Sequence, residues 1–251
     1  MRKIRTCKGG RMNTGSSACK IDWKKVKGAI MVEHGVKLPA DITSEKLLEL
    51  CHADRPDRIY PIFPFLEYAS NGGDPQVNAT GYGASEYNGL NALTDTFTLK
   101  SFDEVLNAQL LRCANKGWDV YFWNQDNTLI GFNDGTDVLA GISMSSVYPT
   151  VTRFPTSGAK STMTVSFAHE DAEESLLNFD YVQLDFNPKN FLMGLVDVVF
   201  EKTEAENAYK IIEKIGGYDR TEEFGSLIAD GAAEVMNNTT SASYADGVIT
   251  I

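Results

Sequence analysis

The segment Ser101–Phe132 constrains the fold more than any other part of the chain, because it combines a short helix with an aromatic hairpin. Ser101, followed three residues later by Glu104, predicts a capping box and therefore a helix start. Apolar residues then recur at helical spacing, and Gly117 is expected to end the helix. Aromatic and β-branched residues indicate a strand over Trp118–Trp123 and, after a turn, a returning strand over Thr128–Phe132. A helix packed on such a hairpin is typical of an α+β fold.

Several further segments have the composition of strands, which makes the predicted fold mainly β. The clearest candidates are Gly28–Glu33, Asp95–Lys100, Ser161–Ala168 and Phe191–Glu201. Tyr60–Tyr68 contains two prolines among aromatic residues and therefore suits the edge of a sheet. We predict an α+β, mainly β fold: a β-sandwich or barrel with one or two flanking helices and a long assembly loop.

The pattern of strand, capped helix and glycine occurs a second time near the C-terminus. Phe200 is followed by Thr203 and Glu206, which form a second capping-box pattern, and apolar residues at helical spacing continue up to Gly216. A duplicated unit would explain this echo, although the arrangement is common enough to occur without duplication.

Composition indicates an ordinary globular chain of one domain with insertions, covering residues 28–251. The sequence has 43% hydrophobic and 23% charged residues and lacks a run of 18 apolar residues, so we expect no membrane anchor. The N-terminus lacks the apolar segment of a secretory signal, so export by that route is not expected. The four cysteines show no Cys-x-x-Cys spacing, which favours free thiols.

The charge is unevenly distributed and separates a basic N-terminal arm, residues 1–27, from an acidic body. The arm contains nine Lys or Arg and one Asp, a charge of +8, so the total of −11 leaves −19 for residues 28–251. A basic arm often binds nucleic acid, but so acidic a body would repel phosphate. We expect the arm to bind another copy of the chain. The alternative is that the arm is a solvated tail without a partner. The expected contacts in the arm are Arg2, Lys3, Arg5, Lys8 and Arg11.

Residues 69–94 form a long polar, glycine-rich stretch that we expect to be an inserted loop. A loop of this length inside a compact domain is usually functional or disordered. Tyr82, Tyr87 and Leu90 give it apolar groups to bury on binding, so we predict assembly contacts there.

The chain closes on an apolar segment, residues 247–251, that is expected to be a strand. Such a strand must pair either with its own sheet or with the edge of a neighbouring subunit. Ile249 and Ile251 are therefore further expected assembly contacts.

Residue patterns give little support to an enzyme, a metal site or a cofactor. The three histidines are not spaced as metal ligands, and no phosphate-binding or nucleophile-elbow motif occurs. Asn133–Asp137 faintly resembles a calcium loop but is better explained as a hairpin turn. The acidic cluster Glu170–Glu174 could supply paired carboxylates for hydrolysis, although such clusters are usually solvated. We expect a non-enzymatic protein without cofactor.

The helix segment T-L-K-S-F-D-E-V-L-N-A-Q-L-L, the stretch 69–94 and the closing S-Y-A-D-G-V-I-T-I carry a resemblance. In these features the chain resembles virion structural proteins of tailed bacteriophages, of the tail-tube or neck-ring type found in phages of Bacteroidetes-like bacteria. The resemblance implies synthesis in the host cytoplasm and incorporation into the virion. It also implies ring-shaped homo-oligomers, commonly hexamers, joined to other tail or neck proteins, with DNA passing through the channel without specific binding.

Two other classes of protein remain as alternatives. A carbohydrate- or surface-binding β-sandwich module would use the aromatic residues of Tyr60–Tyr68 together with Tyr82 and Tyr87 to stack on sugars. A hydrolase would use Glu170–Glu174, and replacing these acids would then abolish turnover.

Overall fold

The computed structural model describes residues 24–251 except residues 40, 137, 152, 153 and 159. The chain divides into two compact units, Met1–Gly194 (unit 1) and Leu195–Ile251 (unit 2). The α+β, mainly β fold is confirmed, with sheets in both units and short helices beside them. The contacts within the chain divide the predicted single domain over residues 28–251 between these two units. The expected strand Phe191–Glu201 begins only at Val198, and the irregular residues before it separate the two units.

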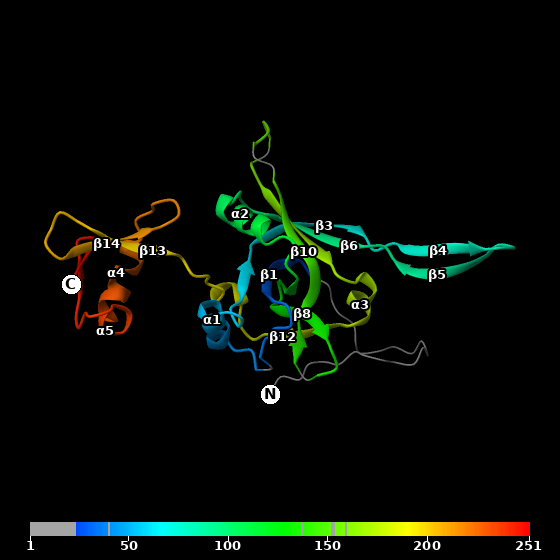
Figure 1. Ribbon diagram of the computed structural model, residues 1–251, viewed down its shortest axis with the longest axis horizontal. Coiled ribbons are helices and arrows are strands. Elements are labelled where there is room, and N and C mark those ends of the chain that lie inside the picture. Colours follow the sequence, from blue (N-terminus) through cyan, green and yellow to red (C-terminus); the bar gives the residue numbers. More distant parts are fainter. Residues whose placement is uncertain (1–23, 40, 137, 152–153, 159) are drawn as a thin grey trace. The chain divides into compact units, whose positions relative to one another are not determined.

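Unit 1 is built on one large curved sheet (Figure 1). Its strands run in the order β12-β8-β7-β10-β11-β6-β3, while β1 pairs with β2 and β7, and β9 pairs with β8. Over the described residues this sheet does not close into a barrel. The strands are β1 (Val26–Glu33), β2 (Tyr60–Ile62), β3 (Phe65–Gly72), β6 (Leu93–Leu99), β7 (Trp118–Asn124), β8 (Thr128–Asn133), β9 (Leu139–Ala140), β10 (Ile142–Val151), β11 (Met163–His169) and β12 (Phe179–Gln183).

Strand β7 is the centre of this sheet, and all of its residues are buried. One edge of β7 pairs with β1 along its whole length. The other edge pairs first with β10, from Trp118 to Val120, and then with β8, at Phe122 and Trp123. The sheet therefore divides at β7 into a branch that leads to β3 and a branch that leads to β12.

Alternation along β7 places its side chains in two separate cores. Val120 and Phe122 belong to a cluster between the two branches, whereas Tyr121 and Trp123 belong to a second cluster on the opposite face. The second cluster includes Leu47 of helix α1 (Ser44–His52). The run of aromatic and β-branched residues reflects burial on both faces, as in a strand covered from both sides.

Helix α2 (Glu104–Arg112) lies where the sequence predicts it but has different ends. Its N-cap is Asp103, whose carboxylate accepts a hydrogen bond of 2.9 Å from the amide of Leu106, so the expected capping box of Ser101 and Glu104 does not form. Aspartate is at least as good an N-cap as serine. The helix ends at Arg112 rather than at Gly117, because Cys113 already leaves the helical conformation. Two other short helices in unit 1 are α3 (Ala172–Leu177) and the 3-10 turn η1 (Pro188–Asn190).

Unit 2 is a small sheet with helices packed on it. Its strands run in the order β13-β14-β16-β15. Helix α4 contacts β14, β15 and β16 closely enough that a β-carbon on Gly225 would lie 2.6 Å from the ring of Tyr244. The elements are β13 (Val198–Lys202), β14 (Ala208–Glu213), α4 (Thr221–Asp230), α5 (Ala232–Val235), β15 (Ser243–Ala245) and β16 (Val248–Thr250).

The predicted second capped helix after Thr203 is wrong. Residues Ala208–Glu213 form strand β14, which pairs with β13 and β16. Asn207 adopts a positive φ of 55°, and the amide of Thr203 donates to the carbonyl of Ala208 at 2.8 Å, which closes a hairpin. Sheet pairing therefore overrides the local capping pattern, and the duplicated-unit interpretation fails with it.

Candidate assembly surface

The expected loop over residues 69–94 is instead the outer part of one long β-hairpin. Strand β3 pairs with β6 as far as Gly72 and Leu93, and the ribbon of β4 (Pro75–Thr80) and β5 (Ala84–Leu90) continues from there. The amide of Asn91 donates to the carbonyl of Asp74 at 3.0 Å, which joins the two parts. Figure 1 shows this ribbon (β4 and β5) extending away from the sheet of unit 1. The stretch contains several glycines, which are typical of turns, and for that reason a loop was predicted there.

The ribbon has an apolar and a polar face, and both are exposed. Val77 pairs with Tyr87, and both side chains are more than half exposed on one face. The neighbouring pair, Asn78 and Glu86, lies on the opposite face. A two-stranded ribbon with both faces largely exposed is marginal in water, and its edges can accept another strand. The apolar face therefore has the character of a surface that is buried on binding.

The tip of the ribbon presents one aromatic side chain. Tyr82 is fully exposed between Gly81 and Gly83, and all three residues have positive φ angles: 24° at Gly81, 45° at Tyr82 and 80° at Gly83. A left-handed conformation costs a tyrosine about 1–2 kcal/mol, whereas glycine adopts it freely. The turn thus holds an aromatic ring outward at a conformational cost.

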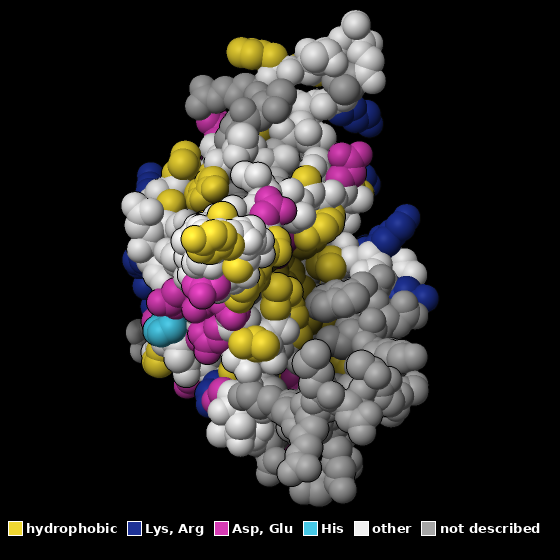
Figure 2. Space-filling model, turned by 90° about the vertical axis from the view of Figure 1, so that its right-hand side faces the viewer, with side chains coloured by type: hydrophobic (Ala, Val, Ile, Leu, Met, Phe, Trp, Pro, Cys, Tyr) yellow, Lys and Arg dark blue, Asp and Glu magenta, His cyan; other side chains and the backbone are white. Residues whose placement is uncertain are grey.

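A groove opens at the foot of the ribbon, between the two branches of the sheet. Its volume is about 630 Å³, within the roughly 300–1,000 Å³ typical of ligand sites. Figure 2, seen from the ribbon side, shows hydrophobic side chains gathered around the ribbon with acidic side chains next to them. The groove is lined by apolar residues and a few polar ones: Lys24, Lys25, Val26, Tyr68, Ser70, Gly72, Gly73, Leu93, Asp95, Phe97, Phe122, Ile130, Leu176 and Phe179.

A chain of hydrogen bonds borders this groove and ties four elements together. The hydroxyl of Tyr68 donates to Oδ1 of Asp95 at 2.8 Å, and Oδ2 of Asp95 lies 2.7 Å from Nε2 of His169. Nδ1 of His169 lies 2.8 Å from Oγ of Ser175 on α3. Burial, together with the bond to Asp95, raises the pKa of Tyr68 to about 12. The network fixes α3 and β11 to the two strands from which the ribbon grows.

This Asp-His-Ser order resembles the catalytic relay of a hydrolase, but the serine is not placed for attack on a substrate. Ser175 is 1% exposed, and its hydroxyl also lies 2.7 Å from the carbonyl oxygen of Asp171 within α3. A nucleophile needs a free approach to the reacting carbon. The arrangement is therefore a structural link.

The acidic cluster that suggested hydrolysis lies on α3, beside the ribbon. The carboxylate of Asp171 caps α3 by accepting from the amides of Glu173 and Glu174 at 2.8 and 3.0 Å. Desolvation, with the charge and hydrogen bonding of Glu173, raises the pKa of Tyr87 on the ribbon. The cluster thus contributes a helix cap and a contact with the foot of the ribbon.

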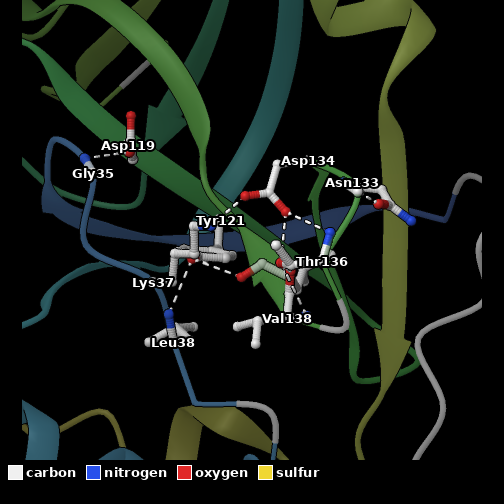
Figure 3. Close-up of polar contacts among 11 residues, drawn as sticks. Gly35, Lys37, Leu38, Asp119, Tyr121, Asn133, Asp134, Thr136 and Val138 are labelled. Atoms are coloured by element: carbon white, nitrogen blue, oxygen red, sulfur yellow. Dashed lines mark hydrogen bonds and ion pairs between the residues drawn. The ribbon is translucent and has the colours of Figure 1, made fainter.

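The turn that faintly resembled a calcium loop forms a separate polar cluster (Figure 3). Its carboxylate, Asp134, binds the ammonium group of Lys37 and accepts from the amide and hydroxyl of Thr136 at 3.1 and 2.7 Å. The bond to Lys37 holds the pKa of Asp134 at about 2. In the part of the chain that the structure describes, no group of three or more His, Cys, Asp or Glu is arranged to hold a metal ion.

The predicted assembly residues fall into three groups. The arm contacts Arg2, Lys3, Arg5, Lys8 and Arg11 lie outside the described residues. Tyr82, Tyr87 and Leu90 all lie on the ribbon, Tyr82 at its tip and the other two along β5. The prediction for Ile249 does not fit, because its side chain is completely buried in unit 2, where it pairs with Tyr209 and Tyr244. Ile251 is 43% exposed.

The predicted assembly contacts leave out three exposed apolar residues of the hairpin, Leu66, Tyr68 and Val77, of which Tyr68 was expected only in the sugar-binding alternative. A signal for Val77 existed, because polar and less polar residues alternate along Pro75–Thr80 as they do in a strand.

Cys51 and Cys113, the cysteines among the described residues, are free thiols as expected. No helix within the described ranges has the length and apolar character needed to cross a membrane. No protein-family model matches the chain, and no curated protein or solved structure is significantly similar to it.

Proposed function

We propose that this chain is a non-enzymatic structural subunit that assembles with copies of itself through the ribbon. The observation that carries the proposal is the ribbon's apolar face, where Val77 and Tyr87 form a cross-strand pair and both remain more than half exposed. Isolated ribbons of two strands are marginally stable, so burial against a partner would stabilise this one.

The setting we propose is a ring in the virion of a tailed phage, as part of a tail tube or neck. The charge of −19 on residues 28–251 supports this setting, because an acidic channel wall would repel the phosphates of passing DNA and let it slide. The basic arm would then bind the acidic surface of an adjacent copy. In a ring the contacts are heterologous, so the arm and its acceptor lie on different surfaces of one subunit.

The ribbon's role is tested by two double variants on the same strands. Val77→Ser with Tyr87→Ser removes the apolar face, and we expect a folded chain that stays monomeric by native mass spectrometry. Asn78→Ser with Thr80→Ser changes the opposite face and should assemble like the unaltered chain. Equal assembly of the two variants would refute the proposal, as would an unaltered chain that is monomeric at high concentration and low salt.

The arm's role is tested by deletion of Met1–Lys20. We expect a protein that keeps its circular dichroism spectrum but forms few rings, because it lacks six of the nine basic residues in the arm. Normal rings from this truncation, in electron micrographs at physiological salt, would count against the arm.

A second candidate function is a carbohydrate- or surface-binding module. The observation that favours it is the exposure of the Tyr68 and Tyr82 rings, since exposed tyrosines can stack on sugars. Specific binding on a glycan array would support this function, whereas an assembly subunit should give no signal.

A further inference from the structure

We propose that the ribbon tip of one copy, with Tyr82 at its end, occupies the groove at the foot of the ribbon in another copy. This inference rests on the proposed self-assembly and names the acceptor surface for it. The proposal rests on four features: the aromatic lining of the groove, the narrow tip, the reach of the ribbon and the charges on both.

The groove offers an aromatic environment for an aromatic ring. Phe97, Phe122 and Phe179 line it, and rings of this kind pack against tyrosine in edge-to-face or offset geometry. The polar atoms at its border are already paired, because Asp95 is bound by Tyr68 and by the buried histidine of β11. A ring can therefore enter without separating a carboxylate from its partners.

The tip is narrow enough to enter a groove of this kind. Gly81 and Gly83 have no side chains, and a β-carbon on either would contact no other residue. Tyr82 is therefore the only side chain at the end of two strands that lie about 4.8 Å apart. A tyrosine that becomes fully desolvated in a pocket is a typical interface hot spot.

The reach of the ribbon excludes its own groove as the acceptor. Gly73 lines the groove, and Tyr82 follows nine residues later along an extended strand. At about 3.3 Å per residue the tip lies roughly 30 Å from the groove of the same chain. Pairing of β4 with β5 from Val77 to Thr80 keeps the ribbon extended. A ribbon tip in this groove therefore comes from another copy.

Two residues that line the groove carry a charge opposite to that of the ribbon. Within Pro75–Leu90 the single charged residue is Glu86, four residues after the tip and roughly 13 Å behind it. Lys24 and Lys25 are among the residues lining the groove. A tip inserted to this depth brings Glu86 near these lysines, which steers association and makes it weaker at high salt.

The test is a photo-crosslinking amino acid, p-benzoylphenylalanine, in place of Tyr82 in the full chain. Mixing isotopically light and heavy chains shows whether a crosslink joins two copies. We expect crosslinks between copies, mapped by mass spectrometry to the groove-lining peptides at residues 68–73, 93–97 and 176–179. The same substitution at Tyr218, an exposed tyrosine of unit 2, is the matched control and should not label the groove.

Two groove variants complete the test, because either one alone could disturb folding. Ser70→Trp narrows the groove from an exposed strand position, and Leu176→Arg makes its wall polar from an exposed helix position. Each should remove the crosslinks and weaken assembly by at least about tenfold, as should Tyr82→Ala. Circular dichroism checks that the variants are folded.

The outcomes separate this inference from the proposed function. A chain that assembles normally while Tyr82 crosslinks elsewhere, or while Tyr82→Ala has no effect, overturns the inference and leaves self-assembly intact. A chain that remains monomeric overturns both. A small apolar molecule found in the groove by native mass spectrometry, retained on assembly, also overturns the inference.

Discussion

The hydroxyl of Tyr121 gives the sharpest test of how the core of unit 1 is held together. Tyr121 is 0% exposed, and its hydroxyl accepts from the amide of Leu38 at 3.1 Å and donates to the carbonyl of Leu139 at 3.0 Å (Figure 3). It therefore connects the segment after β1 with β9. Burial raises the pKa of Tyr121, so the hydroxyl keeps its proton and remains a donor.

Replacing Tyr121 by Phe removes both hydrogen bonds and leaves the ring in place. Leu38 and Leu139 are each 2% exposed, so water cannot readily replace the lost partner. Each buried backbone group that is left unpaired costs about 1–3 kcal/mol. Part of this cost is offset because the variant has no hydroxyl to desolvate, so we expect the free energy of unfolding to fall by about 2 kcal/mol. For a unit of this size that loss lowers Tm by about 4–8 °C.

The measurement is urea unfolding followed by tryptophan fluorescence, since Trp118 and Trp123 are buried in the same unit as Tyr121. The midpoint should fall while the slope with denaturant stays unchanged. Tyr82→Phe removes an equivalent hydroxyl from a fully exposed ring and should change stability by less than about 0.5 kcal/mol. A loss below about 0.5 kcal/mol for Tyr121→Phe would refute the reasoning.

Two further predictions concern an ion pair and a close backbone approach. The pKa of Asp134 in the folded chain, about 2, lies below its ordinary value of 3.8, so its contribution to stability is present above pH 3.8 and is lost as the pH falls toward 2. Asp134→Asn or Lys37→Met should flatten this part of the curve of stability against pH, measured by urea unfolding. A β-carbon on Gly141 would lie 2.7 Å from Cβ of Asp119, so Gly141→Ala should lower Tm by several degrees, whereas Gly158→Ala, in open space, should not.

The aromatic hairpin was predictable because its signals are local. The expected strands Trp118–Trp123 and Thr128–Phe132 agree with β7 and β8 to within one residue at each end. Aromatic and β-branched residues favour strands wherever they can be buried, and Asn127 supplies the positive φ of the turn between these two. Local preference and tertiary packing agree here, so the sequence alone is sufficient to predict this hairpin.

The ribbon could not be recognised in the same way, because it has no buried face. Gly72, Gly73 and Gly89 have positive φ angles within the hairpin, and glycine and asparagine usually mark loops. Strand prediction depends on alternation between apolar and polar residues, and in the ribbon this alternation is clear only along Pro75–Thr80. Tyr82 and Tyr87 could nevertheless be singled out from the sequence, because aromatic residues are out of place in a polar segment.

The hydrogen-bond network at the foot of the ribbon could not be predicted from the sequence for a different reason. Asp95 and His169 are 74 residues apart, and they meet only because β6 pairs with β11. Their bond fixes α3 and the root of the ribbon as one body. If the ribbon binds another copy, the direction in which it points is set here, since a rigid root loses less entropy on binding than a mobile one. In the proposed assembly, the buried polar link would therefore set the direction of the apolar surface that is exposed on the ribbon.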